Sequence, residues 1–177
     1  MENFRSVSLD KTASELVAVM GEQRLEGFVL ALKEKNLTLA SAESCTGGLV
    51  GKLLTDVPGA SAVYLGGIIS YTNEVKINIL GVSEATIEKY TEVSVQTATE
   101  MAECVRKKFS SDIGVSVTGF AGPGGGTEND PVGTVYIAVA TAENTRALRL
   151  SIEGEQSREQ IRRTAAHVIF AMVEKII

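Results

Sequence analysis

The sequence predicts a single-domain α/β protein whose sheet is mixed. Segments with helical periodicity alternate with short apolar segments, which is typical of layered α/β domains. Near the carboxyl end, Val132–Ala142 and Arg146–Ile152 can pair as a hairpin across Glu143 and Asn144, so antiparallel pairing accompanies the crossover units. At 177 residues, and without an internal repeat or a linker, the chain is long enough for one sizeable core.

The amino-terminal part is predicted as an arm, a helical region and a strand. Residues 1–10 show no clear periodicity, and we expect a mobile arm there. Thr12 to Lys35 has a helical pattern that is interrupted at Gly21, so we expect either two helices or one bent helix. The apolar run Leu37–Ala42 is predicted as the first strand.

Turn residues and periodicity predict the remaining elements. A helix that begins after Gly48 ends at the turn of residues 56–59, where Pro58 opposes its continuation. The pair Gly66–Gly67 inside a β-rich segment indicates a bulge or a close backbone approach. We predict a strand over 62–72, short helices beginning at Asn73 and Ser83, an amphipathic helix over 94–109, a buried strand over 112–118 and a last helix over about 157–176.

Composition and charge disfavour several classes of function. A net charge of −5 argues against a sequence-independent grip on nucleic acid, which needs clustered Lys and Arg. There is no run of about 18 apolar residues and no signal-peptide pattern, so we expect a cytoplasmic protein with no membrane partner. Cys45 and Cys104 have no metal-type spacing, and we expect Cys104 to be a partly buried structural thiol.

His167 is the single histidine, and its position limits the catalytic chemistry. It projects opposite the centre of the apolar stripe of the last helix, on the side of Arg163 and Glu174, so we expect it on a solvated face. A Ser-His-Asp triad, a Cys-His dyad and a multi-histidine zinc site are therefore disfavoured. A serine nucleophile in this chain needs a different base.

Residues 39–52 form the strongest candidate for an active site. They are predicted as a strand, a sharp turn and a helix, with polar side chains gathered at the end of the strand. Two interpretations of Ser44 are open: it caps the helix, or it is an activated nucleophile beside the free N–H groups of the helix start. The residues concerned are Ser41, Glu43, Ser44, Cys45 and Thr46, followed by Gly47 and Gly48.

A glycine-rich loop, Gly119–Thr127, follows the predicted strand of residues 112–118. It lacks the G-x-G-x-x-G spacing and precedes another strand, and the stretch around Lys52 departs from a P-loop at two positions. A dinucleotide site and an NTPase are therefore disfavoured. Because ligands in open α/β sheets sit at the carboxyl ends of strands, the loop is either part of a ligand site or a flexible surface loop.

Lys76 is the remaining base for Ser44. A lysine on a short helix is normally a solvated charge, but Ser-Lys pairs are known variants of nucleophilic catalysis. Lowering the pKa of a lysine from about 10.4 to about 7 corresponds to roughly 4–5 kcal/mol of desolvation or charge repulsion. To act as a base, Lys76 must therefore be buried, and we expect Tyr71, at the end of the preceding strand, to help cover it.

Two arginines share one face at the start of the last helix. Arg158 and Arg162 are four residues apart, so their side chains are neighbours. Either they hold a phosphate or a carboxylate, or they form ordinary surface pairs with Glu155 and Glu159.

Four motifs stand in order along the chain: Ala42-Glu-Ser-Cys-Thr-Gly-Gly48, Gly66-Gly-Ile-Ile-Ser-Tyr-Thr-Asn-Glu-Val-Lys76, Val117-Thr-Gly-Phe-Ala-Gly-Pro-Gly-Gly-Gly126 with Pro131-Val-Gly-Thr134, and Arg158-Glu-Gln-Ile-Arg162. Taken together, they resemble the CinA C-terminal family over about residues 25–177. The first twenty or so residues have no counterpart in the family core, so we divide the chain into an N-terminal extension (1–20) and a domain (21–177). Larger CinA proteins carry a further N-terminal nucleotide-hydrolysing domain without counterpart in these residues, and we carry over none of its activity.

The resemblance implies a three-layer α/β/α sandwich that hydrolyses the carboxamide of nicotinamide mononucleotide. The products are nicotinic acid mononucleotide and ammonia, and the reaction belongs to pyridine-nucleotide recycling. The resemblance also implies metal-independent chemistry, no cofactor, and homo-oligomers (a dimer or larger). It places Ser44 as the nucleophile, with Tyr71 and Lys76 as the residues that handle protons. We place the substrate at Glu43, Thr46, Gly47, Gly48, Thr118, Gly119, Gly122 and Arg158.

Two rival functions remain open from the sequence. One is a catalytically silent module that keeps the nucleotide pocket and has a regulatory role or one related to DNA uptake. The other is an amidase whose nucleophile is the thiol of Cys45. In the serine mechanism we expect turn N–H groups near Thr46–Gly48 to stabilise the oxyanion.

Overall fold

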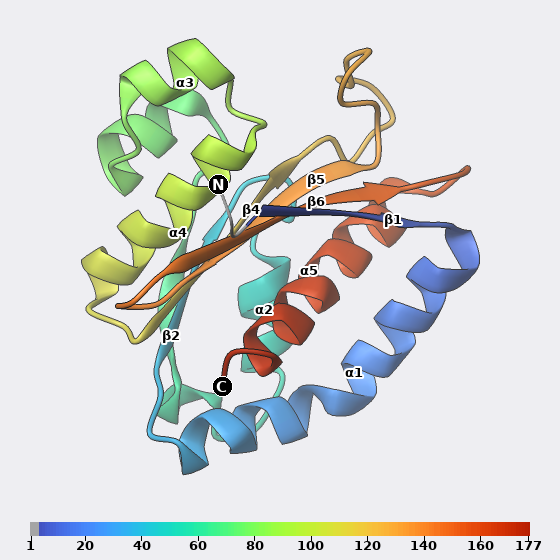
Figure 1. Ribbon diagram of the computed structural model, residues 1–177. Helices are drawn as coiled ribbons and strands as arrows, with labels where there is room; N and C mark the ends of the chain where they lie inside the picture. Colours follow the sequence, from blue (N-terminus) through green and yellow to red (C-terminus); the bar gives the residue numbers. More distant parts are fainter. Residues whose placement is uncertain (1–3) are drawn as a thin grey trace.

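The computed structural model describes residues 4–177, which form a six-stranded sheet. Figure 1 shows that helices cover both faces of this sheet. The expected α/β single domain with a mixed sheet is confirmed. The strands are β1 (Phe4–Leu9), β2 (Leu39–Glu43), β3 (Tyr64–Ile69), β4 (Ile113–Gly119), β5 (Thr134–Ala140) and β6 (Thr145–Ile152). The helices are α1 (Lys11–Glu34), α2 (Leu49–Thr55), α3 (Glu84–Tyr90), α4 (Val95–Phe109) and α5 (Arg158–Glu174), with a 3₁₀ turn η1 (Ala60–Ala62) and a π-helix η2 (Val75–Leu80).

The strand order is β1-β6-β5-β4-β2-β3. The central strands β4 and β2 and the edge strand β3 run parallel, so their carboxyl ends meet at one edge of the sheet. The predicted hairpin of β5 and β6 is confirmed, and β5 also pairs antiparallel with β4. All five residues of β2 and all seven of β5 are buried, because helices cover both faces of these strands. The motif after β2 therefore lies at the edge where the parallel strands end.

Two apolar layers hold the helices to the sheet. On one face α1, α2 and α5 pack through a large cluster that includes Phe28, Leu54 and Ile169. On the other face α4 and η2 pack through Leu80 and Met101 with small residues of β2. In Figure 1, α3 and α4 lie on one side of the sheet, with α1, α2 and α5 on the other. In the part of the chain described, no helix is both long and apolar enough to span a membrane.

The expected mobile arm is wrong for the residues that the structure describes. Phe4–Leu9 form β1, which extends the sheet in parallel with β6 from the pair Phe4–Ala147 to the pair Leu9–Ile152. Because β1 is an edge strand with most of its side chains exposed, its sequence carries no alternation of apolar and polar residues. The prediction for residues 1–3 lies outside the described residues.

Of the two alternatives for the first helix, a single helix is correct. Asp10 caps α1 by accepting a hydrogen bond from the N–H of Ala13 at 2.8 Å, and the helix runs through Gly21 without a break. The helix packs along α5, and Gly21 lies against the ring of His167. A Cβ at residue 21 would fall 2.2 Å from Nδ1 of His167, so a glycine is needed for this close approach.

The expected solvated position of His167 is wrong. The residue is only 2% exposed, and neither ring nitrogen has a hydrogen-bond partner among the described residues. Helix α5 lies between the sheet and α1, so two of its faces are buried. The apolar stripe of α5 identifies only the face that packs on the sheet, and His167 lies on the face that packs on α1. Burial lowers the pKa of His167 to about 4, with Arg163 adding to the effect.

The predicted irregularity at Gly66–Gly67 is confirmed as a bulge. The register of β2 with β3 passes from Leu39–Tyr64 to Ala40–Gly66, so one residue of β3 is left over. Gly66 has a φ of 133°, which strongly favours glycine. The other predicted helices and strands are present, with ends that differ by a few residues.

Candidate active site

The turn after β2 is organised by the carboxylate of Glu43. Its Oε2 accepts hydrogen bonds from the hydroxyl of Thr46 and from the backbone N–H of Gly48 and Val50, at 2.8 to 3.0 Å. Its Oε1 accepts one from the N–H of Gly51 at 2.9 Å. These N–H groups belong to the start of α2, where a negative charge is favoured by the helix dipole. Glu43 is 2% exposed, so it holds the turn and has no free oxygen for a substrate, contrary to our prediction.

Ser44 does not cap the helix. The N-cap of α2 is Gly48, in a left-handed conformation and without a capping side chain. Thr46, which is nearer the helix start than Ser44, does not cap it either, because its hydroxyl donates to Glu43. The capping interpretation is therefore wrong for Ser44, and its hydroxyl is left for another partner.

That partner is Lys76. Its Nζ lies 3.0 Å from the Oγ of Ser44, although the two residues are 32 positions apart in the chain. The expected burial is confirmed, since Lys76 is 0% exposed. Burial lowers the pKa of Lys76 from its usual value, and Glu92 offsets this in part. Among the described residues no carboxylate forms a salt bridge with Lys76.

Two backbone carbonyls complete the surroundings of Lys76. Nζ donates to the carbonyl oxygen of Ser70 at 2.8 Å and lies 3.4 Å from that of Tyr71. Lys76 is near the start of η2, where its own carbonyl accepts hydrogen bonds from the N–H of both Gly81 and Val82. Leu80 anchors the far end of η2 in the core. The π-helix therefore holds the lysine under the end of β3, pointing at Ser44.

The side chain of Tyr71 does not cover Lys76. It is 58% exposed, and its hydroxyl accepts a hydrogen bond from Arg158 at 3.2 Å. Arg158 also donates to the carbonyl of Gly122 at 2.7 Å, so it ties the glycine-rich loop to the end of β3. Tyr71 makes no side-chain contact with Ser44 or Lys76 in the hydrogen bonds of the described residues. Its backbone carbonyl is the part that faces the lysine.

The second arginine of the motif also faces this edge. Arg162 donates from Nε to the carbonyl of Thr46 at 3.1 Å, and Nη2 contacts the same oxygen. Neither Arg158 nor Arg162 takes part in the salt bridges of the described residues, which disfavours the surface-pair interpretation. Two guanidinium groups therefore stand beside the turn that carries Ser44.

Two further predicted residues make structural contacts. Thr118 is fully buried, and its hydroxyl donates to the carbonyl of Glu92 at 2.7 Å, which fastens the segment before α4 to β4. A Cβ on Gly119 would fall 2.5 Å from the carbonyl of Thr134, so this glycine permits close packing of β4 and β5. The hydroxyl of Thr118 is therefore already paired, and Gly119 serves the packing of the two strands. Gly47, with a φ of 57°, and Gly48 shape the turn itself.

Cys45 is a poor nucleophile in this setting. The residue is 6% exposed, and burial raises the pKa of its thiol to about 12. A thiol with this pKa is protonated at neutral pH, whereas the thiolate is the reactive form. Cys104 is partly buried and donates from Sγ to the carbonyl of Gly81, as expected of a structural thiol.

Sequence reasoning missed two contributors to this edge, Ser70 and the backbone N–H of Cys45. Ser70, next to Tyr71 in the second motif, is fully buried and supplies the carbonyl that binds Lys76. The backbone N–H of Cys45 and that of Thr46, which lies in the stretch expected to supply oxyanion donors, have no hydrogen-bond partner on another described residue, whereas that of Gly47 donates to the carbonyl of Ser44. The position of Ser70 directly after a strand could have indicated that it lies near the site. The direction of its side chain could not be predicted, because the bulge in β3 shifts the alternation of side chains along the strand.

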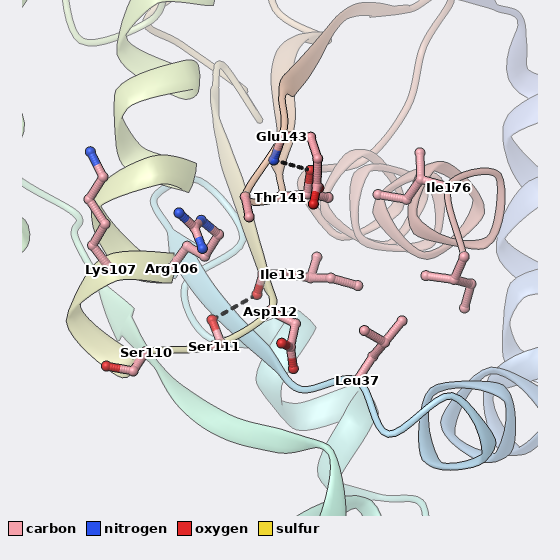
Figure 2. A pocket seen from close by; sticks show the side chains of 12 residues that line it. Leu37, Arg106, Lys107, Ser110, Ser111, Asp112, Ile113, Thr141, Glu143 and Ile176 are labelled. Atoms are coloured by element: carbon pink, nitrogen blue, oxygen red, sulfur yellow. Dashed lines mark hydrogen bonds between the residues drawn. The ribbon is translucent and has the colours of Figure 1, made fainter.

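A large cavity lies elsewhere in the molecule. This cavity has a volume of about 620 Å³. Figure 2 shows side chains that line it, among them Leu37, Arg106, Asp112 and Glu143. Leu37 precedes β2 and Asp112 precedes β4, so the cavity is at the amino ends of these strands, opposite to Ser44. It contains none of the predicted site residues. Over residues 4–177, no group of three or more His, Cys, Asp or Glu side chains is arranged to hold a metal ion.

Comparisons with known proteins match most of the chain. A model of the CinA C-terminal domain matches residues 22–177. A CinA-like protein of Thermotoga maritima is 42% identical over 169 residues, 96% of this chain and 41% of that protein. A relative from Thermoanaerobacter sp. (strain X514), whose name refers to competence-damage induction, is 48% identical over 156 residues, 88% of this chain and 38% of that protein. The chain thus spans about two fifths of the length of these relatives.

A solved structure covers the same region. The crystal structure of the competence/damage inducible protein CihA from Agrobacterium tumefaciens superposes with a TM-score of 0.84 at 34% identity, covering 88% of this chain and 94% of that one. The fold described above is therefore shared with a solved member of this group.

Proposed function

The chain belongs to the family of CinA C-terminal domains, and on that premise we propose that it is an amidohydrolase acting on nicotinamide mononucleotide. The proposed reaction hydrolyses the carboxamide to a carboxylate and releases ammonia. The observation that carries the proposal is the contact of Lys76 with Ser44 at 3.0 Å, with the lysine buried and without a carboxylate partner.

The contacts of Lys76 suit a neutral amine. A neutral amine has two N–H bonds and one lone pair. If the two N–H bonds point to the carbonyls of Ser70 and Tyr71, the lone pair is left to accept the proton of Ser44. Both carbonyls belong to the segment that follows β3 directly, and the N–H of Ser70 ties this segment to the carbonyl of Glu43. Burial favours the neutral form of Lys76, and the charge of Glu92 offsets this only in part.

The proposed chemistry proceeds in two halves. In the first, Oγ of Ser44 forms a bond to the carboxamide carbon while its proton passes to Nζ of Lys76. The carbon–nitrogen bond then breaks, Lys76 returns the proton to the leaving nitrogen, and ammonia departs. In the second half, Lys76 takes a proton from water, the hydroxide adds to the ester carbon, and the proton returns to Oγ as the acid is released. Protons balance in each half, and Lys76 ends neutral.

The oxyanion donors are revised by the structure. The expected donors near Thr46–Gly48 are partly occupied, because the N–H of Gly48 donates to Glu43 and that of Gly47 donates to Ser44. The N–H groups of Cys45 and Thr46 have no such partner among the described residues. We assign these two groups to the oxyanion, since free donors next to the nucleophile are where the charge develops.

Arg158 and the glycine-rich loop supply the proposed grip on the nucleotide. Arg158 is exposed at the amino end of α5 and touches both Gly122 and Tyr71, so its guanidinium lies between the two segments that flank the site. A planar guanidinium suits the oxygens of a phosphate. Tyr71 then acts in substrate positioning, or in proton transfer after movement. A homo-oligomer and a cytoplasmic location remain parts of the same proposal.

A product assay tests this proposal. Purified protein is incubated separately with nicotinamide mononucleotide, nicotinamide, nicotinamide riboside and glutamine, and ammonia is measured together with the acid product. We expect release from the mononucleotide above all, and loss of nearly all turnover in Ser44→Ala and Lys76→Ala proteins that remain folded. A kcat close to that of the unchanged protein in either variant would rule out the assignment.

Two alternatives are separated by the same assay. A silent nucleotide-binding module, in keeping with the competence-related names of the relatives, binds the mononucleotide but releases no ammonia. A Cys45 amidase loses activity in Cys45→Ser, whereas the serine mechanism predicts activity within a few-fold of the original. The raised pKa of the Cys45 thiol supports retained activity in Cys45→Ser.

A further inference from the structure

Ser70 is a buried residue whose side chain has no evident structural task. It is 0% exposed, and its hydroxyl has no hydrogen-bond partner among the described residues. Both of its backbone groups are used: the N–H donates to the carbonyl of Glu43 at 2.8 Å, and the carbonyl accepts from Lys76. The residue thus touches the turn that carries the nucleophile on one side and the base on the other.

Other buried serines of the sheet do have partners. The hydroxyl of Ser41 lies 2.7 Å from that of Tyr64, and the hydroxyl of Ser116 donates to the carbonyl of Ala98. An unpaired buried hydroxyl is unfavourable, so a position with only a structural role is better served by alanine. Thr134 also has an unpaired buried hydroxyl, but no contact joins it to Lys76. Ser70 alone among these residues adjoins the base.

The change in charge of Lys76 during the reaction creates a need for one more acceptor. Before the reaction, the neutral amine has two N–H bonds for two carbonyls, and Ser44 occupies the lone pair. After acylation, whenever the lysine is protonated, it has three N–H bonds, while Oγ of Ser44 has become an ester oxygen, which is a poor acceptor. The carbonyls of Ser70 and Tyr71 accept two of the three.

We propose that Ser70 is a positioning residue whose hydroxyl accepts the third hydrogen of protonated Lys76 while Ser44 is acylated. The inference rests on the proposed Ser44–Lys76 chemistry. A rotation of one side-chain torsion moves only this hydroxyl, on a residue whose carbonyl already contacts Nζ. The hydroxyl is thus unpaired in the free protein, and it is paired in the acylated protein whenever Lys76 is protonated.

The test compares Ser70→Ala with Thr134→Val, which removes the other unpaired buried hydroxyl of the described residues, at the start of β5, and keeps the shape of the side chain. For Ser70→Ala we expect kcat on nicotinamide mononucleotide to fall about 10-fold and KM to fall with it, so that kcat/KM stays within 2-fold, because Ser70 acts only after acylation. Because the charged form of Lys76 loses an acceptor only in the acyl-enzyme, the acidic limb of kcat should move to lower pH by about one unit while that of kcat/KM stays in place. Ser70→Thr, which keeps the hydroxyl, should restore the original kcat limb.

Thr134→Val should leave both limbs unmoved. An unshifted kcat limb in Ser70→Ala, or an equal shift in Thr134→Val, overturns the inference.

A second measurement separates this inference from the proposed function. Ser44 is sulfonylated with an aryl sulfonyl fluoride, which leaves a covalent group on Oγ as in the acyl-enzyme, and the pKa of Lys76 is followed by NMR of carbon-labelled lysine. In the sulfonylated protein, Ser70→Ala should lower that pKa by about one unit; an equal pKa in both proteins overturns the role of Ser70. Absence of ammonia release by the unchanged protein overturns the proposed substrate instead, and leaves this comparison readable.

Discussion

Lys76 and His167 are both buried bases with lowered pKa values, but their surroundings differ. Lys76 has a hydroxyl at 3.0 Å and two carbonyls beside it, and all three partners come from the carboxyl edge of the sheet. His167 lies between α1 and α5, and both of its nitrogens are unpaired among the described residues. It borders a small cavity of about 140 Å³ whose lining includes Arg24, which pairs with Glu174. Burial alone therefore does not identify a catalytic base.

The difference teaches that partners, more than the pKa, distinguish reactive from packed groups. Desolvation is the largest cause of the lowered pKa at both residues. Only at Lys76 is the buried nitrogen within hydrogen-bond distance of a serine hydroxyl, that of Ser44. At His167 the ring is packed against Gly21 and approaches Phe170 edge-on, with centroids 5.9 Å apart, as an apolar ring would be.

The largest expected effect comes from replacing each base by an apolar side chain of similar size. Lys76→Met should lower kcat by about 10³-fold or more, because loss of a general base alone typically costs 10² to 10⁴-fold. His167→Leu should leave kcat unchanged, because among the described residues no hydrogen bond links the ring of His167 to the Ser44 turn. Steady-state kinetics with thermal unfolding of both variants checks this. A large loss of kcat in folded His167→Leu would break the comparison.

Removing Glu43 should have the next largest effect, on stability. Glu43→Ala leaves the N–H groups of Gly48, Val50 and Gly51 without their acceptor at the start of α2. We expect a loss of about 3 kcal/mol in the free energy of unfolding, since charge-assisted hydrogen bonds are the stronger class. Urea denaturation measures it. Thr46→Val, which removes one of the donors, should cost about 1 kcal/mol; an equal cost for both variants would contradict a central role for the carboxylate.

The pH dependence of stability sharpens the comparison at His167. Its pKa in the folded protein is about 4, below the ordinary value of 6.5, so the unfolded state binds a proton first. Stability should therefore decrease as the pH falls from about 6.5 to about 4, by about 3 kcal/mol in total. Urea denaturation at pH 8, 6, 5 and 4 measures this. The decrease should be smaller by that amount in His167→Leu, and an unchanged pH profile in this variant would be the contrary result.

Gly21→Ala should have the smallest effect. The added methyl group meets the ring of His167 at 2.2 Å, so helix α1 or the ring must shift, and we expect a loss of about 1–3 kcal/mol. In a protein that already carries His167→Ala the clash is absent, so Gly21→Ala should lower the free energy of unfolding by less than it does in the original protein. A double-mutant cycle by thermal or urea unfolding gives the coupling. Additive effects would show that the two residues do not meet.

The fold class and the pair Ser44–Lys76 were accessible from the sequence for identifiable reasons. Apolar segments alternating with helical ones are local signals, and the hairpin of β5 and β6 is one as well. The placement of Lys76 followed from the motifs and from the need for a base other than histidine. Two features without a local signal were predicted wrongly. Strand β1 has mostly exposed side chains and so no alternating pattern, and His167 is buried by a helix more than a hundred residues away in the chain.

The roles of individual polar residues were harder to predict for the same reason. Glu43, Thr118 and Ser70 have ordinary sequence surroundings, and their hydrogen bonds are decided by turns and by neighbouring strands. Glu43 and Thr118 were expected to meet a substrate and instead hold the frame of the site. Tyr71 was expected over Lys76, but its side chain points to Arg158. Such directions depend on tertiary packing, which periodicity does not report.

The π-helix that carries Lys76 constrains the length of the chain there. A π-turn holds one residue more than an α-turn, so η2 contains, in effect, a one-residue insertion between the lysine and Gly81. Deleting one residue between Lys76 and Leu80 would restore α-helical spacing and leave Leu80 facing nearly the same way relative to Lys76, because an α-turn closes with one residue fewer. Inserting a further residue there would instead turn Leu80 away, so that either Leu80 leaves the core or the amine leaves Ser44. The segment should therefore tolerate a deletion better than an insertion, and substitution at the exposed Ile79 is tolerable.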